Sequence, residues 1–242
     1  MSALYRLLTI TCFTILLGCN NDPAAILLFN GTGTSPNDVA AVETILDNNN
    51  LKYQTVNSSS LNAMSREQLN SYRLLIVPGG DFMVMGNSLT KATAANIRHA
   101  VQHGLNYLGI CAGGFLAGNS KYYNGFNLAS GATFRFYSAA NKGVSKAAVA
   151  ITNPDGTALD QYWEDGPQLS GWGEAVAKYP DGTPAVAEGK CGKGFIILTG
   201  IHAEAPADWR RGMVFNTSVS ADNGYAEMLI RAGFNGNALP HY

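Results

Sequence analysis

Three side chains with the chemistry of cysteine-dependent acyl transfer stand just after apolar runs of the sequence. Cys111 follows the run Tyr-Leu-Gly-Ile at residues 107–110, and His202 and Glu204 follow a second run that ends at Gly200. A thiol nucleophile needs a base and a third group that orients the base. We therefore predict that Cys111 attacks, His202 transfers the proton and Glu204 holds the imidazole.

The neighbours of Cys111 favour a nucleophile over a cysteine that only fills space. Gly109, Ala112, Gly113 and Gly114 surround it, and small residues permit the sharp strand-to-helix turn that exposes a nucleophile. A helix that begins just after residue 111 would also favour the thiolate. A small buried cysteine is the commoner structural role, but this cluster of small residues favours the catalytic interpretation.

Glycine-rich loops predict an oxyanion hole and the walls of a cleft. The backbone N–H groups of Gly80 and Ala112 are the candidates for the oxyanion hole, since glycines at 79 and 80 let the main chain turn its amides towards the site. The predicted cleft-lining residues are Gly31, Gly79, Asp81, Gly113, Tyr162, Gly166 and Pro167. For residues 162–167, an aromatic hairpin in the core is an equally good interpretation.

The elements that must position these residues follow an α/β pattern. In the first half, short apolar runs predict strands at residues 25–29, 52–56, 74–77 and 105–110, and amphipathic stretches predict helices at 36–46, 64–69, 91–103 and 112–118. Alternating strands and helices imply a parallel sheet with right-handed crossovers. Ligands bind at the carboxyl ends of such strands, where all the candidate segments fall.

The second half is richer in strands and loops. Strands are expected at residues 147–151, 175–179, 185–188 and 195–198, with hairpin-type turns at Asp155-Gly156 and Asp181-Gly182 and a closing helix at 221–232. No internal repeat, charge block or linker divides the chain. We expect residues 25–242 to form a single domain.

The order Cys111, His202, Glu204 resembles that of the class I glutamine amidotransferase-like superfamily, and the chain is similar to its biotin-protein ligase N-terminal domain family. The segments that carry the resemblance are Val-Pro-Gly-Gly-Asp at 77–81, Gly-Ile-Cys-Ala-Gly-Gly-Phe at 109–115, Tyr-Trp-Glu-Asp-Gly-Pro-Gln at 162–168 and Gly-Ile-His-Ala-Glu at 200–204. The resemblance implies a flavodoxin-like three-layer sandwich with a mostly parallel central sheet and a more β-rich second half.

One departure from the family pattern is mild. The usual His-Pro-Glu reads His-Ala-Glu at residues 202–204, which keeps both functional side chains. No biotin-ligase catalytic domain follows in the sequence, so the resemblance does not imply ligase activity. A glutamine amidotransferase also needs an acceptor synthetase. We do not expect an exported, lipid-anchored protein to meet a cytosolic synthetase.

Composition excludes several classes of function. The chain is 46% hydrophobic and 14% charged with a net charge of −1, which fits neither a disordered chain nor a basic nucleic-acid surface. Gly31-Thr-Gly33 opens like a dinucleotide fingerprint, but Pro36 stands where the third glycine is needed. His99 and His103 stand four apart without an adjacent glutamate. We therefore expect no nucleic acid, cofactor or metal, and a small-molecule or peptide-like amide as substrate.

The first residues predict an export signal. Arg6 precedes an uncharged, largely apolar run of eleven residues. As a helix this run would be about 16 Å long, too short for the roughly 30 Å bilayer core. The sequence Leu-Leu-Gly-Cys at 16–19 resembles the lipobox of bacterial lipoproteins. We expect residues 1–18 to be a signal peptide, Cys19 to be acylated and 19–24 to be a tether. An ordinary signal peptide or a buried first helix remains the alternative.

Asn20 after the acylated cysteine favours the outer membrane, so the predicted location is the bacterial cell envelope, lipid-anchored and facing the periplasm. Removal of Cys12 and acylation of Cys19 leave two thiols, Cys111 and Cys191. In an oxidising compartment these two can form a disulfide, but free thiols fit the predicted role of Cys111 better.

Two functions from different classes fit these observations. The first is an exported, lipid-anchored hydrolase or acyl transferase that uses Cys111, His202 and Glu204 on an amide-type substrate. The second is a non-catalytic ligand-binding module of the cell envelope that uses the same cleft. A Cys111–Cys191 disulfide would make the cleft inactive, and the sequence leaves the protein partner and the substrate open.

Overall fold

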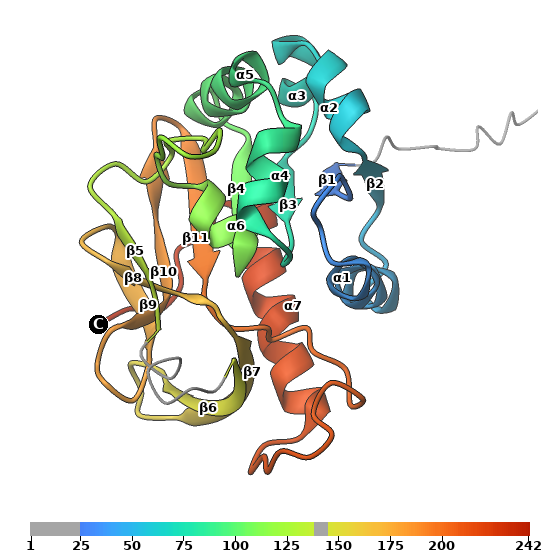
Figure 1. The fold of residues 1–242 in the computed structure, drawn as a ribbon. Helices are drawn as coiled ribbons and strands as arrows, with labels where there is room; N and C mark the ends of the chain where they lie inside the picture. Colours follow the sequence, from blue (N-terminus) through green and yellow to red (C-terminus); the bar gives the residue numbers. More distant parts are fainter. Residues whose placement is uncertain (1–24, 138–144) are drawn as a thin grey trace, which may run out of the picture.

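A nine-stranded sheet runs through the protein, with helices on both of its faces (Figure 1). This computed structural model describes residues 25–137 and 145–242. The predicted signal peptide, Cys19 and the tether lie outside the described residues. Among the described residues, no helix combines the length and apolar character that a membrane crossing requires.

Eleven strands and seven helices make up the described chain. The strands are β1 (Ile26–Phe29), β2 (Tyr53–Val56), β3 (Leu74–Val77), β4 (Asn106–Ile110), β5 (Thr133–Phe136), β6 (Lys146–Thr152), β7 (Ala158–Glu164), β8 (Pro167–Ser170), β9 (Glu174–Lys178), β10 (Pro184–Cys191) and β11 (Gly194–Thr199). The helices are α1 (Pro36–Asn48), α2 (Ser58–Ala63), α3 (Arg66–Asn70), α4 (Phe82–Ser88), α5 (Lys91–Gln102), α6 (Ala112–Leu116) and α7 (Val219–Asn235).

The sheet has a parallel half and an antiparallel half, in the order β2-β1-β3-β4-β11-β10-β9-β6-β7. From β2 to β11 every neighbouring pair is parallel, and Val77 pairs with Gly109 while Thr199 pairs with Ile110. This register aligns the carboxyl ends of β3, β4 and β11. The residues that follow these three strands therefore emerge side by side at one edge.

The antiparallel half extends the sheet beyond β11. Strands β10, β9, β6 and β7 each run opposite to the strand before them in the sheet. Strands β5 and β8 form a separate antiparallel pair. This half brings β7 to the same edge, since Tyr162 makes an isolated antiparallel bridge with His202.

Two hydrophobic cores, one on each face, hold the three layers together. Helices α1 and α7 cover one face, where Val42 and Leu229 pack with Leu28 of β1. Helices α2 to α6 cover the other face, where Ile97 and Leu116 pack with Leu75 of β3. Strands β1, β3 and β11 are buried along their whole length, as expected of central strands in a parallel sheet.

Local sequence explains how α1 begins beside the site. Ser35 caps the helix, its side chain accepting a hydrogen bond from the N–H of Asp38, and Pro36 takes the first helical position, where its missing N–H costs nothing. At the far end of the chain, α7 stops at Gly236 in the left-handed conformation, φ 67°. The start of α1 directly follows β1, so it lies at the edge of the sheet where the candidate residues gather.

The predicted fold class is confirmed, and most predicted elements are present with bounds that differ by one or two residues. Helices α2 and α4 and strands β5, β7 and β8 were not predicted. The two helices are only six and seven residues long, too short to show a helical period. Four successive residues of β7, at 160–163, are buried. The strand therefore lacks the alternation typical of a half-exposed strand.

Candidate active site

Cys111 occupies a sharp turn between β4 and α6. Its backbone has φ 49° and ψ −102°, a positive φ that costs a residue with a side chain roughly 1–3 kcal/mol. Its N–H donates to the carbonyl oxygen of Thr199 at 2.8 Å, which ties the turn to the end of β11. The turn therefore holds the sulfur at the carboxyl edge of the sheet, as predicted for a nucleophile.

The thiol lies at the wall of a cavity and has two polar neighbours. Cys111 is 7% exposed and lines the cavity described below. Its sulfur donates to the carbonyl oxygen of Glu164 at 3.5 Å. It also lies near enough to His202, the base that the sequence predicted, to raise the pKa of the imidazole.

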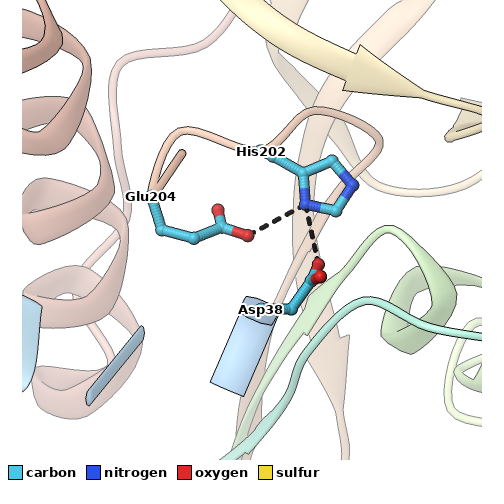
Figure 2. A group of neighbouring side chains, drawn as sticks. All are labelled: Asp38, His202 and Glu204. Carbon is cyan, nitrogen blue, oxygen red and sulfur yellow. Dashed lines mark hydrogen bonds and ion pairs between the residues drawn. The ribbon is translucent and has the colours of Figure 1, made fainter. Parts of the chain in front are cut away.

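Backbone and side-chain contacts hold His202 in place. Its backbone N–H donates to the carbonyl oxygen of Tyr162 at 2.8 Å. The rings of Tyr162 and Trp209 stand edge-on to the imidazole, each with its centroid 5.8 Å away. Nδ1 is 2.9 Å from Oε1 of Glu204 (Figure 2). Since Nδ1 faces this carboxylate, Nε2 is the ring nitrogen that remains for the sulfur of Cys111.

A second carboxylate, Asp38, reaches the same nitrogen and was missed by the sequence analysis. Its Oδ1 lies 3.1 Å from Nδ1 of His202, and Figure 2 shows both carboxylates directed at one ring nitrogen. Asp38 is the third residue of α1 and is 7% exposed. In the sequence it has the appearance of an ordinary acidic residue in the first turn of a helix, which favours the helix dipole. Its place just after β1 was the available signal.

Gly79 leaves the space through which Asp38 reaches His202. A Cβ at residue 79 would lie 2.0 Å from Oδ1 of Asp38 and 2.8 Å from Cε1 of His202. Both distances are far below normal contact. Only glycine at this position permits the Asp38–His202 contact.

The charges in the site favour a protonated histidine. Burial by itself lowers the pKa of His202, but the nearby Cys111, Glu204 and Asp38 outweigh it, so this pKa lies well above its ordinary range. Burial raises the pKa of Asp38, yet the hydrogen bond and charge of His202 leave it below its ordinary range. Each group thus stabilises the charged form of the other.

The two amides predicted for the oxyanion hole lie at the cavity. Gly80 and Ala112 both line it, and within the described residues neither N–H donates to a protein acceptor. Gly80 has φ 146°, and a Cβ there would lie 2.3 Å from the carbonyl oxygen of Gly33. The conformation that leaves this amide free therefore requires glycine.

The cavity has a volume of about 990 Å³. The predicted residues Gly80, Asp81, Cys111, Ala112, Tyr162 and His202 line it, whereas Gly31, Gly79, Gly113, Gly166, Pro167 and Glu204 do not. Gly166 and Pro167 are buried, their carbonyl oxygens accepting hydrogen bonds from Trp163 and Tyr179. These residues support the site from behind.

Several lining residues were not predicted. Phe82, Phe115 and Phe136 form an aromatic cluster, with Phe82 and Phe115 stacked at 4.5 Å between ring centroids. The charged side chains Lys146, Asp208 and Arg211 also line the cavity. They come from elements far apart in the sequence, so no spacing pattern marks them.

Glu164 and Asp165 form an exposed acidic pair at the end of β7. Both line the cavity, and the hydroxyl of Tyr162 donates to Oε2 of Glu164 at 2.5 Å. Burial and the charge of Glu164 raise the pKa of Asp165. The pair belongs to the rim of the site.

A buried ion pair anchors the loop that carries Asp208, Trp209 and Arg211. Arg210 is 8% exposed and pairs with the carboxylate of Asp222, which is 1% exposed, on α7. Arg210 also donates to the carbonyl oxygen of Thr217 at 3.1 Å. This anchor fixes Trp209 against His202.

One carboxylate oxygen of Asp38, one of Glu204 and a ring nitrogen of His202 lie within 4.8 Å of one another (Figure 2). This spacing also suits a metal ion. The separations of 2.9 and 3.1 Å are those of direct hydrogen bonds and ion pairs. The contacts of the imidazole therefore explain the cluster without a metal. His99 and His103 instead stack on each other at 4.0 Å between ring centroids.

Both described cysteines, Cys111 and Cys191, are free thiols. The sequence left a disulfide between them open, and the structure has the two residues as separate thiols. A free sulfur at residue 111 is what a nucleophilic role requires.

The sequence pattern of the family described as "Biotin-protein ligase, N terminal" matches residues 24–148. This match covers half of the chain and includes β1 to β4 and Cys111. The chain belongs to this family. In this member of the biotin-protein ligase N-terminal family, His202 and Glu204 lie beyond the matched residues 24–148. Their roles therefore rest on the geometry above. No curated protein matches the sequence.

Several solved structures share the fold of this family member, a glutamine amidotransferase among them. A glutamine amidotransferase from Thermotoga maritima is similar with a TM-score of 0.55 and 13% identity, covering 86% of this chain and 97% of its own. The catalytic mutant of a beta-galactosidase from G. stearothermophilus has a TM-score of 0.56 and 13% identity, covering 91% of this chain. The chain spans only 31% of that enzyme. At these identities the likeness concerns the fold.

Proposed function

We propose that the protein is a cysteine-dependent hydrolase or acyl transferase that acts on an amide-type substrate. The observation that carries the proposal is that Cys111 and His202 line one cavity, with Glu204 behind them hydrogen-bonded to the imidazole. These are the nucleophile, the base and the orienting group of thiol catalysis. The amidotransferase-like fold supports the same reaction class by analogy.

The first half of the reaction acylates the enzyme. The sulfur of Cys111 attacks the substrate carbonyl carbon and forms a C–S bond, while the oxygen takes the negative charge. The N–H groups of Gly80 and Ala112 stabilise this oxyanion, and one such donor is worth about 3–4 kcal/mol. The C–N bond then breaks, and His202 gives its proton to the leaving amine.

The second half releases the acyl group. His202 takes a proton from water, or from another acceptor nucleophile, which attacks the thioester carbonyl. The C–S bond breaks and the sulfur leaves. Glu204 stays ionised throughout and stabilises the imidazolium that forms twice in the cycle.

The cavity suits a small or peptide-like amide. Its volume of about 990 Å³ lies at the upper end of the ~300–1,000 Å³ typical of small-molecule sites. The aromatic cluster of Phe82, Phe115 and Phe136 offers an apolar wall, and the charged residues at the rim offer polar contacts. A substrate with both an apolar and a polar part fits these walls.

We also propose that the protein is exported and anchored by a lipid on Cys19 at the outer membrane, facing the periplasm. The support is the short apolar run before Leu-Leu-Gly-Cys at residues 16–19. Cells fed an alkyne fatty acid should yield a labelled protein in the outer-membrane fraction. A Cys19→Ala variant should lose the label, and an unlabelled wild-type protein would contradict the anchor.

A ligand-binding module without catalysis is the second candidate. It is favoured by the hydrogen bond from the sulfur of Cys111 to the carbonyl oxygen of Glu164, which stabilises an inert thiol. In this case the cavity binds a ligand and Cys111 forms no covalent intermediate.

Capture of the acyl-enzyme separates the two candidates. Purified protein is incubated with cell-envelope extract, quenched in acid and digested, and the Cys111 peptide is read by mass spectrometry. The catalytic proposal predicts an acyl mass on this peptide that hydroxylamine removes and that Cys111→Ala abolishes. An unmodified peptide, together with retained ligand binding in Cys111→Ala, would support the binding module.

A further inference from the structure

Two carboxylates meet one nitrogen in the site, although a catalytic histidine needs only one partner there. Nδ1 of His202 carries a single hydrogen, and the hydrogen-bond geometry directs it to Glu204. Oδ1 of Asp38 lies 3.1 Å from the same nitrogen and has no other partner within the described residues. The side chain of Asp38 is 10% exposed, so water satisfies little of it.

A buried, unpaired carboxylate is unfavourable unless a positive charge compensates it. In the part of the chain that the structure describes, the charge in contact with Oδ1 of Asp38 is that of His202 in its protonated form. A neutral imidazole would leave two buried carboxylates beside Nδ1 with no positive charge to compensate them. The arrangement is therefore stable when the ring carries a second proton on Nε2, next to the sulfur of Cys111.

Other titratable groups face His202 from the elements packed around it. Cys111 faces it from the β4–α6 turn and Glu204 from its own loop. Tyr162 faces it from β7 and holds Glu164 through its hydroxyl. Asp208 and Arg211 flank Trp209, which packs on the ring. Of these, Glu204 is the one that contacts Nδ1 together with Asp38.

We propose that Asp38 is a positioning residue that keeps His202 as an imidazolium in the resting protein, so that Cys111 waits as a thiolate. The inference rests on the proposed function and adds a second carboxylate to the predicted group of three residues. One proton moves from the sulfur to Nε2, and no bond to carbon forms or breaks. The proton is then already in place for the leaving amine when the thiolate attacks.

The location of Asp38 makes this role separable from that of Glu204. Glu204 lies two residues from His202 on the same loop, whereas Asp38 comes from α1, the element that follows β1. Gly79, two residues after β3, leaves the space in which Asp38 contacts His202. The structure thus links the first helix to the imidazole by a contact that a local loop could not supply.

The test measures the protonation of His202 directly. Protein labelled with ¹⁵N at histidine is titrated by NMR, because the shifts of Nδ1 and Nε2 distinguish the neutral ring from the imidazolium. In the wild-type protein we expect an imidazolium at pH 7.5. A neutral His202 at that pH would overturn the proposal without any variant.

Variants then assign the effect to Asp38. Asp38→Asn should lower the proton affinity of His202 at least about tenfold, a shift of about one pH unit, and Asp38→Glu should restore part of it. Asp47→Asn removes an exposed charge from the same helix and should leave the titration unchanged. Equal shifts in Asp38→Asn and Asp47→Asn, or none in either, would overturn the proposal.

A turnover measurement keeps this outcome apart from the proposed function. If Asp38→Asn shifts the alkaline limb of the pH–rate profile towards lower pH, Asp38 acts through the imidazolium. A lower rate with unmoved limbs would mean a purely structural role and would overturn the inference. Failure of the proposed function would instead appear as turnover that survives Cys111→Ala.

Discussion

Nδ1 of His202 lies 2.9 Å from Oε1 of Glu204, two residues further along the chain. Both side chains are buried, with the imidazole 5% and the carboxylate 2% exposed. Since the contact is enclosed, it fixes which ring nitrogen faces Cys111.

We predict that Glu204→Gln lowers kcat by about 10²–10⁴-fold, because a neutral amide no longer stabilises the imidazolium. Steady-state kinetics would measure it, with Glu174→Gln, at an exposed position at the start of β9, as control. An equal rate in both variants would contradict the role.

The strained backbone at Cys111 predicts a reversed order of stability between two variants. At most sites Gly is less stable than Ala by about 0.5–1 kcal/mol. At φ 49°, Cys111→Gly should instead be more stable than Cys111→Ala by about 1 kcal/mol, because glycine relieves the strain. Urea denaturation of both variants measures the difference. The ordinary order, with Ala more stable, would mean that the turn is relaxed.

Gly80 is predicted to be intolerant of a side chain. In Gly80→Ala the new Cβ would meet the carbonyl oxygen of Gly33, and φ 146° would be strained. We expect a loss of about 1–3 kcal/mol in stability and a larger loss in kcat than in substrate binding, because an oxyanion donor moves. Ligand affinity, kinetics and thermal unfolding would be compared. Full activity in Gly80→Ala would exclude its amide from the oxyanion hole.

The ion pair between Arg210 and Asp222 should matter far more than an exposed one. Asp222→Asn leaves the buried guanidinium without its charge partner and should cost about 3–5 kcal/mol. The exposed pair Glu227–Arg231 at 2.7 Å is the control, where Glu227→Gln should cost about 0.5 kcal/mol or less. Urea denaturation distinguishes the two. Similar small losses in both variants would show that the loop beside the site does not depend on this anchor.

The raised pKa of His202 makes its contribution to stability depend on pH. The folded pKa is raised above the unfolded value of about 6.5. The folded state therefore binds the proton more tightly, and the stabilisation is complete below about pH 6.5 and disappears as pH rises through the folded pKa. The free energy of unfolding of the wild type minus that of His202→Gln should thus fall as pH rises. A difference that grows with pH would contradict the sign.

Much of the fold was predictable because buried parallel strands and amphipathic helices leave strong patterns. Residues 74–77 are a continuous apolar run and residues 105–110 a mostly apolar one, and the structure has strands β3 and β4 there. Cys111 and His202 stood out because they directly follow such runs. Strands β5 and β8 form a small pair of four residues each, too short to leave a period in the sequence.

The rest of the site depends on contacts between distant segments. Asp38 looks like a helix-start residue, and only the packing of α1 on a face of the sheet brings it to His202. Trp209 lies in an irregular loop, and the Arg210–Asp222 pair that places it spans to α7. Such partners are chosen by tertiary packing, which a single sequence does not display.

Competition between the two thiols of this chain tests the central claim most directly. Cys191 is more exposed than Cys111, and burial raises the pKa of the Cys191 thiol. Alkylation by limiting iodoacetamide at pH 6 is followed peptide by peptide with mass spectrometry. A thiolate paired with His202 predicts that Cys111, despite its lower exposure, reacts at least about tenfold faster than Cys191, and that His202→Ala removes this preference. Faster alkylation of Cys191, or a preference that survives His202→Ala, would contradict an activated nucleophile.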